Sequence, residues 1–166
     1  MLIFTHIKQP RLNYIKHNPD ESYLLIGRNG VGKSHIGWAL YRDAVSKQRN
    51  VVACSVRDLL MDFRRLELGV ADGETLKPPR VSVEDLRRPH NRWFLFLDEF
   101  EKARPTEFAA EQLFGVLDAA MSFKHQLIIT SNLKTDELRQ HWSRASEVYG
   151  TSIMTRVQIC ILIDFS

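Results

Sequence analysis

Eight consecutive residues near the start of the chain have the types and spacing of a phosphate-binding loop. They are Gly27, Arg28, Asn29, Gly30, Val31, Gly32, Lys33 and Ser34. The glycines let the backbone turn so that several N–H groups point to one place, which suits an anion at the start of a helix. Lys33 would carry a positive charge to the β- and γ-phosphates of ATP, and the Ser34 hydroxyl would bind Mg²⁺. The alternative is a glycine-rich turn without a ligand.

Two adjacent acids, Asp98 and Glu99, directly follow the apolar run Trp-Phe-Leu-Phe-Leu at 93–97. Such a run is typical of a central parallel strand that is covered on both faces. Ligands of parallel sheets bind beyond the carboxyl ends of the strands, where both acids would lie. Asp98 would hold the metal through water, and Glu99 would polarise the attacking water. The alternative is that the two acids only end the strand in solvent.

A third candidate, Asn132, follows Thr130 and Ser131 at the end of the apolar run 127–129. Its amide could orient a water at the γ-phosphate. Taken alone, Ser-Asn after a strand is ordinary turn chemistry. If the strand before Asn132 lies beside the strand that ends in the two acids, a role for Asn132 in orienting the water is favoured.

The elements that must position these residues alternate between strand and helix, as in α/β proteins. Strands are predicted at 23–26, 51–54, 93–97, 127–129 and 158–163. Helices are predicted at about 32–47, after the capping residues Ser55, Thr106 and Thr135, and as a short segment at 82–88. Residues 69–92 are otherwise the least regular part. Residues 1–21, with Pro10 and Pro19 as breakers, are predicted to form an irregular lead-in segment before an ATPase core at 22–166.

The composition is that of one globular domain, with 166 residues of which 44% are hydrophobic and 26% charged. Two cysteines, Cys54 and Cys160, lie in apolar runs without metal-ligand spacing, and both are expected to be buried thiols. No stretch has the pattern of a signal peptide or a membrane span, so a cytoplasmic location is expected. The net charge of +3 permits contact with nucleic acid but does not require it.

Four blocks of the chain resemble, in order and spacing, the DnaC/IstB branch of AAA+ ATPases, which comprises bacterial helicase loaders and transposition helper ATPases. They are Gly27–Ser34 followed by His35, Leu97–Phe100, Ile128–Leu133 and Gly150–Val157. The first two blocks are common to many P-loop ATPases, whereas the last two make the resemblance specific. It covers roughly residues 20–164. The resemblance implies a three-layer α/β fold with a five-stranded parallel sheet in the order 5-1-4-3-2, and little or no C-terminal lid.

The resemblance also implies roles that spacing alone does not show. Asn132 takes the sensor position, and Arg156 takes the position of an arginine finger that reaches the ATP of a neighbouring subunit. From the residues alone, Arg156 would be a surface charge just before an edge strand. A cation supplied in trans stabilises the charge of phosphoryl transfer and couples hydrolysis to assembly. A homo-oligomer that forms with ATP is therefore expected.

Two groups of basic residues could contact the phosphates of single-stranded DNA. They are Arg57, Arg64 and Arg65, and then Arg87, Arg88, His90 and Arg92. Binding of this kind would be weak and would fall with salt. The alternative is a solvated polar face.

The predicted function is ATP hydrolysis in a DNA-associated assembly that loads a replicative helicase. Loaders of the family usually carry a helicase-binding segment before the ATPase core, whereas only about twenty residues precede the first predicted strand here. A helper ATPase that delivers a transposase would keep the motor and change the client. A P-loop kinase would need an arginine-rich lid, but residues 100–125 hold few basic residues. A nucleotide-gated binding module that barely hydrolyses would not need Glu99.

Overall fold

Five parallel strands form one sheet in the computed structural model, which describes residues 9–68 and 80–165. The strands are β1 (Tyr23–Ile26), β2 (Asn50–Ser55), β3 (Trp93–Asp98), β4 (Gln126–Ser131) and β5 (Ile161–Asp164). Their order across the sheet is β2-β3-β4-β1-β5. The predicted order 5-1-4-3-2 is confirmed, because it is the same order read from the other edge.

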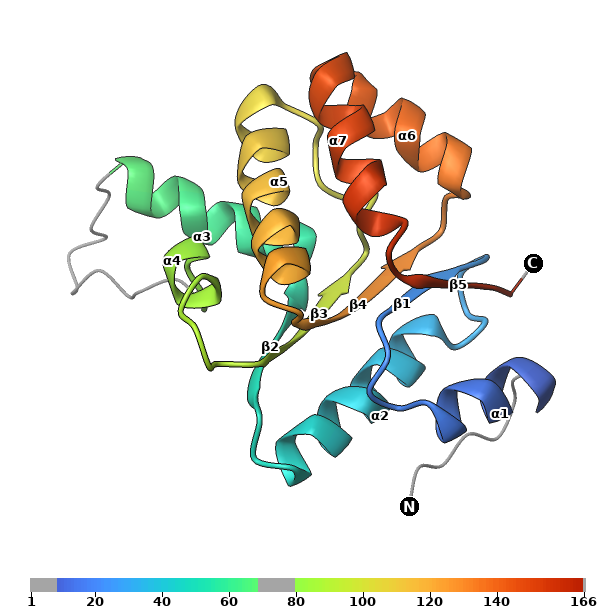
Figure 1. The fold of residues 1–166 in the computed structure, drawn as a ribbon. Helices are drawn as coiled ribbons and strands as arrows, with labels where there is room; N and C mark the ends of the chain where they lie inside the picture. The colour runs from blue at the N-terminus through green and yellow to red at the C-terminus, as the bar shows by residue number, and fades with distance from the viewer. Residues whose placement is uncertain (1–8, 69–79, 166) are drawn as a thin grey trace.

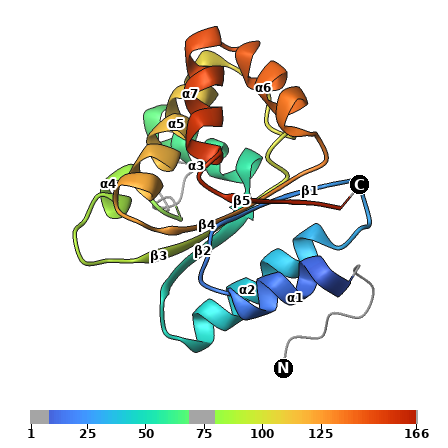
Figure 2. The same ribbon diagram turned by 45° about the vertical axis from the view of Figure 1, so that its right-hand side comes forward.

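Helices cover both faces of the sheet and give three layers (Figure 1). One face carries α1 (Gln9–His17) and α2 (Lys33–Ser46), which Figure 2 shows side by side. The other face carries α3 (Val56–Leu68), α5 (Glu107–Ser122), α6 (Thr135–Ser143) and α7 (Glu147–Val157). The short α4 (Val83–Leu86), within the predicted 82–88 segment, lies against α5. The predicted three-layer α/β class is confirmed.

The central strand β3 is buried on both faces, as its unbroken apolar run predicts. Phe94 and Phe96 pack in the core on the α1 and α2 side, whereas Leu95 and Leu97 pack in the core on the α5 side. Because side chains alternate between the two faces of a strand, each residue of the run finds apolar neighbours. This packing holds the end of β3 in place at the sheet edge where the two acids follow.

Two of the three predicted helix caps are confirmed. The hydroxyls of Ser55 and Thr106 each accept the backbone N–H three residues on, at 3.1 and 3.2 Å. The prediction for Thr135 is wrong, because Thr135 is the first residue of α6 and Lys134 holds the cap position. There the backbone N–H of Lys134 donates to the Glu137 carboxylate at 2.7 Å, so a side chain in the first turn satisfies the N–H of the cap residue.

The first helix, α1, lies within the segment predicted to be irregular, so that prediction is wrong for residues 9–17. Leu12 and Ile15 are 3% and 0% exposed in the core beneath the sheet. Pro10 does not break the helix, because it lies in the first turn, where no helical hydrogen bond needs its missing N–H. The prediction for residues 1–8 falls outside the described residues.

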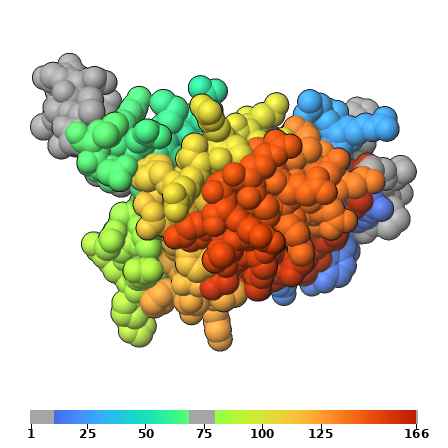
Figure 3. Space-filling model, turned by 90° about the horizontal axis from the view of Figure 1, so that it is seen from above, coloured from blue at the N-terminus to red at the C-terminus, as the bar shows by residue number. Residues whose placement is uncertain are grey.

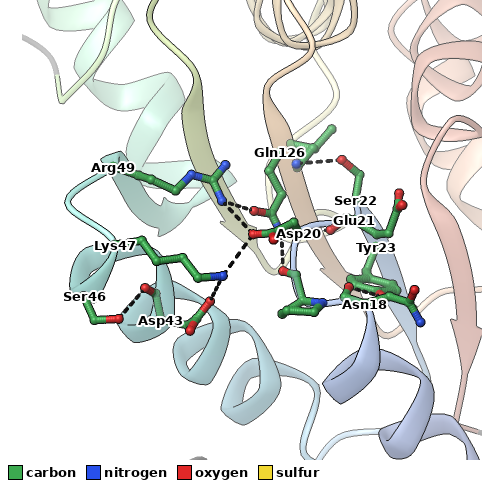
Figure 4. A network of polar contacts seen from close by, with 12 residues as sticks. Asn18, Asp20, Glu21, Ser22, Tyr23, Asp43, Ser46, Lys47, Arg49 and Gln126 are labelled. Carbon is green, nitrogen blue, oxygen red and sulfur yellow. Dashed lines mark hydrogen bonds and ion pairs between the residues drawn. The ribbon is translucent and has the colours of Figure 1, made fainter.

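A polar network at the amino-terminal edge of the sheet holds the segment between α1 and β1 (Figure 4). The buried side chain of Gln126 donates to the carbonyls of Pro19 and Glu21 at 2.8 and 2.9 Å. Its carbonyl oxygen accepts from Arg49 at 2.6 Å. The hydroxyl of Ser22 accepts the next N–H of β4 at 2.9 Å. Since Gln126 begins β4, these bonds fix where β1 enters the sheet beside β4.

The last strand begins later than predicted, at Ile161 rather than at residue 158. The backbone N–H of Cys160 donates to the carbonyl of Val157 at 3.0 Å, so helical turns continue past the end of α7. The sheet bonding begins with the N–H of Ile161, which donates to Ser22 at 2.8 Å. Of the irregular stretch predicted at 69–92, residues 69–79 lie outside the described residues.

Both cysteines are buried and free, as predicted. Burial raises the pKa of Cys54 to about 11 and that of Cys160 to about 12, so neither thiol ionises at neutral pH. Within residues 9–68 and 80–165, every helix is too short or too polar to cross a bilayer.

The burial of α1 predicts that Ile15→Ala destabilises the whole domain. Removal of a fully buried isoleucine side chain leaves a cavity and should lower the free energy of unfolding by about 2–5 kcal/mol. Tyr14→Ala is the matched control, because Tyr14 on the same helix is 46% exposed. Urea unfolding measures both variants. Equal stability of Ile15→Ala and wild type would show that α1 is not part of the cooperative core.

Candidate functional site

The carboxyl ends of β1, β3 and β4 meet at one edge of the sheet and border a cavity of about 220 Å³. Because β4 lies between the other two, its end is close to both the glycine loop and the two acids. The lining residues are Asn29, Gly30, Gly32, Lys33, Ser34, His35, Asp98, Glu99, Glu101, Thr130, Ser131 and Asn132. The structure therefore brings most of the predicted site residues together. Those that do not line the cavity are Gly27, Arg28, Val31 and Arg156.

The backbone of the loop requires glycine at two positions for different reasons. Gly32 has a φ of 96° and precedes α2 without any side-chain cap, which leaves the first N–H groups of the helix to an anion. A Cβ on Gly27 would lie 2.9 Å from the Cβ of Phe165, so a side chain there would push the loop away from the end of β5. Together these features fit an oxyanion such as a phosphate.

The ammonium group of Lys33 is buried, with 7% of the residue exposed, and protein oxygens surround it. It donates to the carbonyls of Gly27 and Arg28 at 2.7 and 2.9 Å. It also donates to the side-chain oxygen of Asn132 at 2.9 Å. Burial lowers the pKa of Lys33, and the carboxylates of Glu101 and Asp98 act in the opposite direction. The ammonium group is therefore held at the cavity wall by contacts that phosphate oxygens could replace.

The carboxylate of Asp98 joins the loop to the sheet. Its Oδ1 accepts from the hydroxyl of Ser34 at 2.9 Å and also from the hydroxyl of Thr130. No cluster of three or more metal-binding side chains occurs among the described residues. Mg²⁺ is usually held by one or two oxygen side chains together with substrate phosphates and water, so Ser34 and Asp98 fit this metal.

Glu99 borders the cavity with an exposed side chain. Its backbone has a φ of 54°, a left-handed conformation that is uncommon for any residue with a side chain and occurs often at functional sites. The N–H of Glu99 donates to the hydroxyl of Thr130 at 3.0 Å, which fixes this turn to β4. No hydrogen bond from another described residue occupies its carboxylate, so the group is available to a water in the cavity.

Glu101 is a cavity residue that the sequence motifs do not identify. Its Oε1 accepts from the side-chain amide of Asn132 at 2.6 Å. The only signal in the sequence is that Glu101 follows the two acids closely, and position alone does not show whether such a side chain returns to the site. Asn132 follows β4 beside the strand of the two acids, as predicted, and the structure adds that its side chain bonds to both Lys33 and Glu101.

Arg156 lies on α7 outside the cavity of its own chain. Its guanidinium donates to Asp118 of α5 at 3.0 and 3.2 Å and lies 4.5 Å from the ring centre of Phe114. The side chain is 23% exposed. A role toward a neighbouring subunit stays a prediction.

Comparison with known proteins identifies relatives over nearly the whole chain. Residues 9–160 match the family model of IstB-like ATP-binding proteins. The chain is 22% identical over 146 residues to the chromosomal replication initiator protein DnaA of Helicobacter hepaticus, an alignment that covers 82% of this chain and 30% of that protein. The chain thus spans less than a third of the length of this curated relative.

Three solved structures share the fold. The crystal structure of DnaI has a TM-score of 0.70 at 16% identity and covers 94% of this chain and 83% of the other. The crystal structure of the DnaC helicase loader has a TM-score of 0.64 at 18% identity and covers 97% of this chain and 93% of the other. The structure of the replication initiator DnaA bound to AMPPCP and single-stranded DNA has a TM-score of 0.69 at 15% identity. It covers 100% of this chain and 48% of the other. Because all three sequences are less than 25% identical to this chain, the structural similarity shows a shared fold and nothing more.

The geometry of the cavity predicts that Lys33→Ala abolishes tight ATP binding. Loss of charge-assisted hydrogen bonds to the phosphates should weaken the affinity by about 100-fold or more. Nucleotide titration measures this, with Lys47→Ala as the matched control, since Lys47 lies at the far end of α2 and forms ion pairs with Asp20 and Asp43 there. Unchanged affinity in Lys33→Ala would remove the loop from the nucleotide site.

Proposed function

This chain belongs to the family of IstB-like ATP-binding proteins, and on that premise we propose that it hydrolyses ATP with Mg²⁺ and acts as a cytoplasmic helicase loader in DNA replication. The observation that supports hydrolysis is the Glu99 carboxylate, which borders the cavity one residue beyond Asp98 and has no hydrogen bond to another described residue. A protein that only bound the nucleotide would need Lys33 and the loop but no such group. Phosphate release without a phosphorylated product would exclude both a kinase and a pure binding module.

Each side chain has a separate task in the proposed reaction. Lys33 exchanges its protein oxygens for those of the β- and γ-phosphates. Glu99 accepts a proton from the attacking water, and Asn132 orients that water or the γ-phosphate. Mg²⁺, held by Ser34 and Asp98, would neutralise charge on the phosphates.

The assignment of a helicase as client is supported by the fold shared with the DnaC helicase loader, of which the alignment covers 93%. A transposition helper ATPase is the alternative that membership of the IstB-like family supports. ATP-dependent binding to purified replicative helicase, and none to transposase, is the expected result. Binding to transposase and none to helicase would instead identify a transposition helper ATPase.

Two basic hollows support contact with single-stranded DNA, which one DnaA structure contains. The first, about 370 Å³, lies between α3 and the start of α5, and its charged lining residues are Arg57, Arg64, Lys102 and Arg104. The second, about 290 Å³, is lined by Arg88, His90, Asn91, Arg92, Phe123 and Lys124. Neither set includes a carboxylate, so both fit phosphates. Arg64 also lies 5.8 Å from the ring centre of Phe108, a ring on which a base could stack.

The first hollow predicts a specific change in the salt dependence of DNA binding. Each phosphate contact to a single strand contributes about 0.7 to the slope of log affinity against log salt. Arg64→Ala should therefore lower the slope by about 0.7 and weaken binding equally for all sequences, whereas Arg42→Ala, an exposed arginine of α2 on the opposite face of the sheet, should change neither. Fluorescence anisotropy at several salt concentrations measures both. Binding that does not depend on salt would contradict phosphate contact.

A homo-oligomer is supported by the place of Arg156, which lies outside its own cavity on the face of the sheet that α5, α6 and α7 cover. Figure 3 shows α5, α6 and α7 as one continuous face of the molecule. The contacts of Arg156 with Asp118 and Phe114 hold the guanidinium on this side while part of it stays exposed. A neighbouring subunit that docks here could place its ATP against the guanidinium.

The trans role of Arg156 predicts that two inactive variants restore each other. Glu99→Gln should bind ATP but lose hydrolysis on the order of 100-fold, because it lacks the base. Arg156→Ala should bind ATP normally and hydrolyse poorly, because its neighbour lacks the cation. A mixture should exceed either alone, since a Glu99→Gln subunit supplies its arginine to an intact Glu99 next to it. Phosphate release per subunit measures this.

The control for the mixing experiment is Arg144→Ala, which removes an exposed arginine between α6 and α7. It should hydrolyse ATP like the wild type, because Arg144 has no assigned role. Weak ATP binding by the isolated Arg156→Ala monomer, or a mixture no better than its parts, would refute action in trans.

A further inference from the structure

Glu101 returns to the cavity because the chain makes a left-handed turn immediately after β3. The turn at Glu99 directs Phe100 into the core, where it is 0% exposed and packs against Trp142 at 5.6 Å between ring centres. The N–H of Phe100 donates to the carbonyl of Thr130 at 2.9 Å. These contacts place the next residue, Glu101, beside Asn132 two positions beyond Thr130.

A second anchor fixes the other end of this loop. The ring nitrogen Nε2 of His141 donates to the carbonyl of Ala103 at 3.0 Å. The backbone is therefore held at Phe100 and at Ala103, on either side of Glu101. From this position the Glu101 carboxylate contacts Asn132.

The amide of Asn132 has only one favourable orientation between its two partners. The ammonium group of Lys33 can only donate, and the carboxylate of Glu101 accepts. A flipped amide would place NH₂ against the ammonium group and oxygen against the carboxylate, and both contacts would be repulsive. Lys33 and Glu101 thus set the direction of the amide together.

Under the proposed function, ATP binding would remove one of these two partners. When Lys33 turns to the phosphates, the oxygen of Asn132 loses the hydrogen bond that holds it at 2.9 Å. The bond from its Nδ2 to Glu101 at 2.6 Å is then the contact that still fixes the amide. The second N–H of the same nitrogen stays available for a water or a γ-phosphate oxygen.

We propose that Glu101 is a positioning residue that keeps the Asn132 amide aimed at the γ-phosphate while ATP is bound. This inference rests on the proposed ATPase function. The other carboxylate oxygen of Glu101, Oε2, is buried and has no hydrogen-bond partner among the described residues, so the bond from Asn132 is the hydrogen bond that holds this carboxylate.

Three variants test the proposal in steady-state phosphate release. Glu101→Ala should lower kcat by about 10- to 100-fold, because a loosely held amide orients the reaction poorly, while the KM for ATP should not rise. Glu101→Gln keeps an oxygen that accepts from Asn132 and should restore kcat to within about threefold of wild type. Glu111→Gln, an exposed acid on α5, should leave both constants unchanged. A Glu101→Gln enzyme as slow as Glu101→Ala would overturn the proposal in favour of a direct effect of charge.

A double-mutant cycle shows whether Glu101 acts through Asn132. If it does, Glu101→Ala should have no further effect on kcat in an Asn132→Ala background. Multiplying losses would mean that Glu101 acts on its own, which would also overturn the proposal.

The side-chain amide resonance of Asn132 gives a readout that does not need hydrolysis. Its ¹⁵N–¹H signal, assigned by its loss in Asn132→Ala, should shift in Glu101→Ala and stay in place in Glu111→Gln. If the wild type releases no phosphate, the proposed function fails and this resonance alone decides the contact. An unmoved resonance in Glu101→Ala would refute the positioning of Asn132.

Discussion

The buried ammonium group of Lys33 imposes the main physical constraint on this site. A charge in that position is costly unless hydrogen bonds compensate it. Three oxygens do so, two from the carbonyls of Gly27 and Arg28 and one from Asn132 at the end of β4. These oxygens can converge on the ammonium group only if β4 lies next to β1. In the observed order, β4 is inserted between β3 and β1, so β1 does not pair with β2, its neighbour in the sequence. The network around Gln126 holds the same two strands at their other end.

The sequence predicts the layers and the strand order well, because β1, β3 and β4 are short apolar runs and the resemblance supplies their arrangement. It fails where tertiary contacts override local signals. Pro10 suggested a break, but it lies in the first turn of α1, where the buried Ile15 stabilises the helix. Other contacts give no local signal: Gly150 lies inside α7, and a Cβ there would be 2.4 Å from the Ser143 hydroxyl, so the glycine permits the close approach of α6 and α7.

The candidate site divides in the same way. The glycine loop, Asp98 and Glu99 are identified from the sequence because their chemistry depends on neighbours in the chain. Glu101 is not identified, because its place depends on a left-handed residue before it and on the burial of Phe100. The sequence identifies Asn132 less clearly than it identifies the glycine loop, because Ser-Asn after a strand is ordinary. Its contacts with Lys33 and Glu101 become visible only in the structure.

The loop from Glu99 to Arg104 borders both the cavity and the first basic hollow, with Glu101 on one side and Lys102 and Arg104 on the other. Burial of Phe100 and the bond between His141 and Ala103 hold its backbone, so a ligand on one side cannot easily displace it. Under the proposed function, communication between DNA and ATP would therefore travel through charge rather than through loop movement. Coupling of this electrostatic kind weakens as salt rises, whereas coupling through a rearranged backbone would persist.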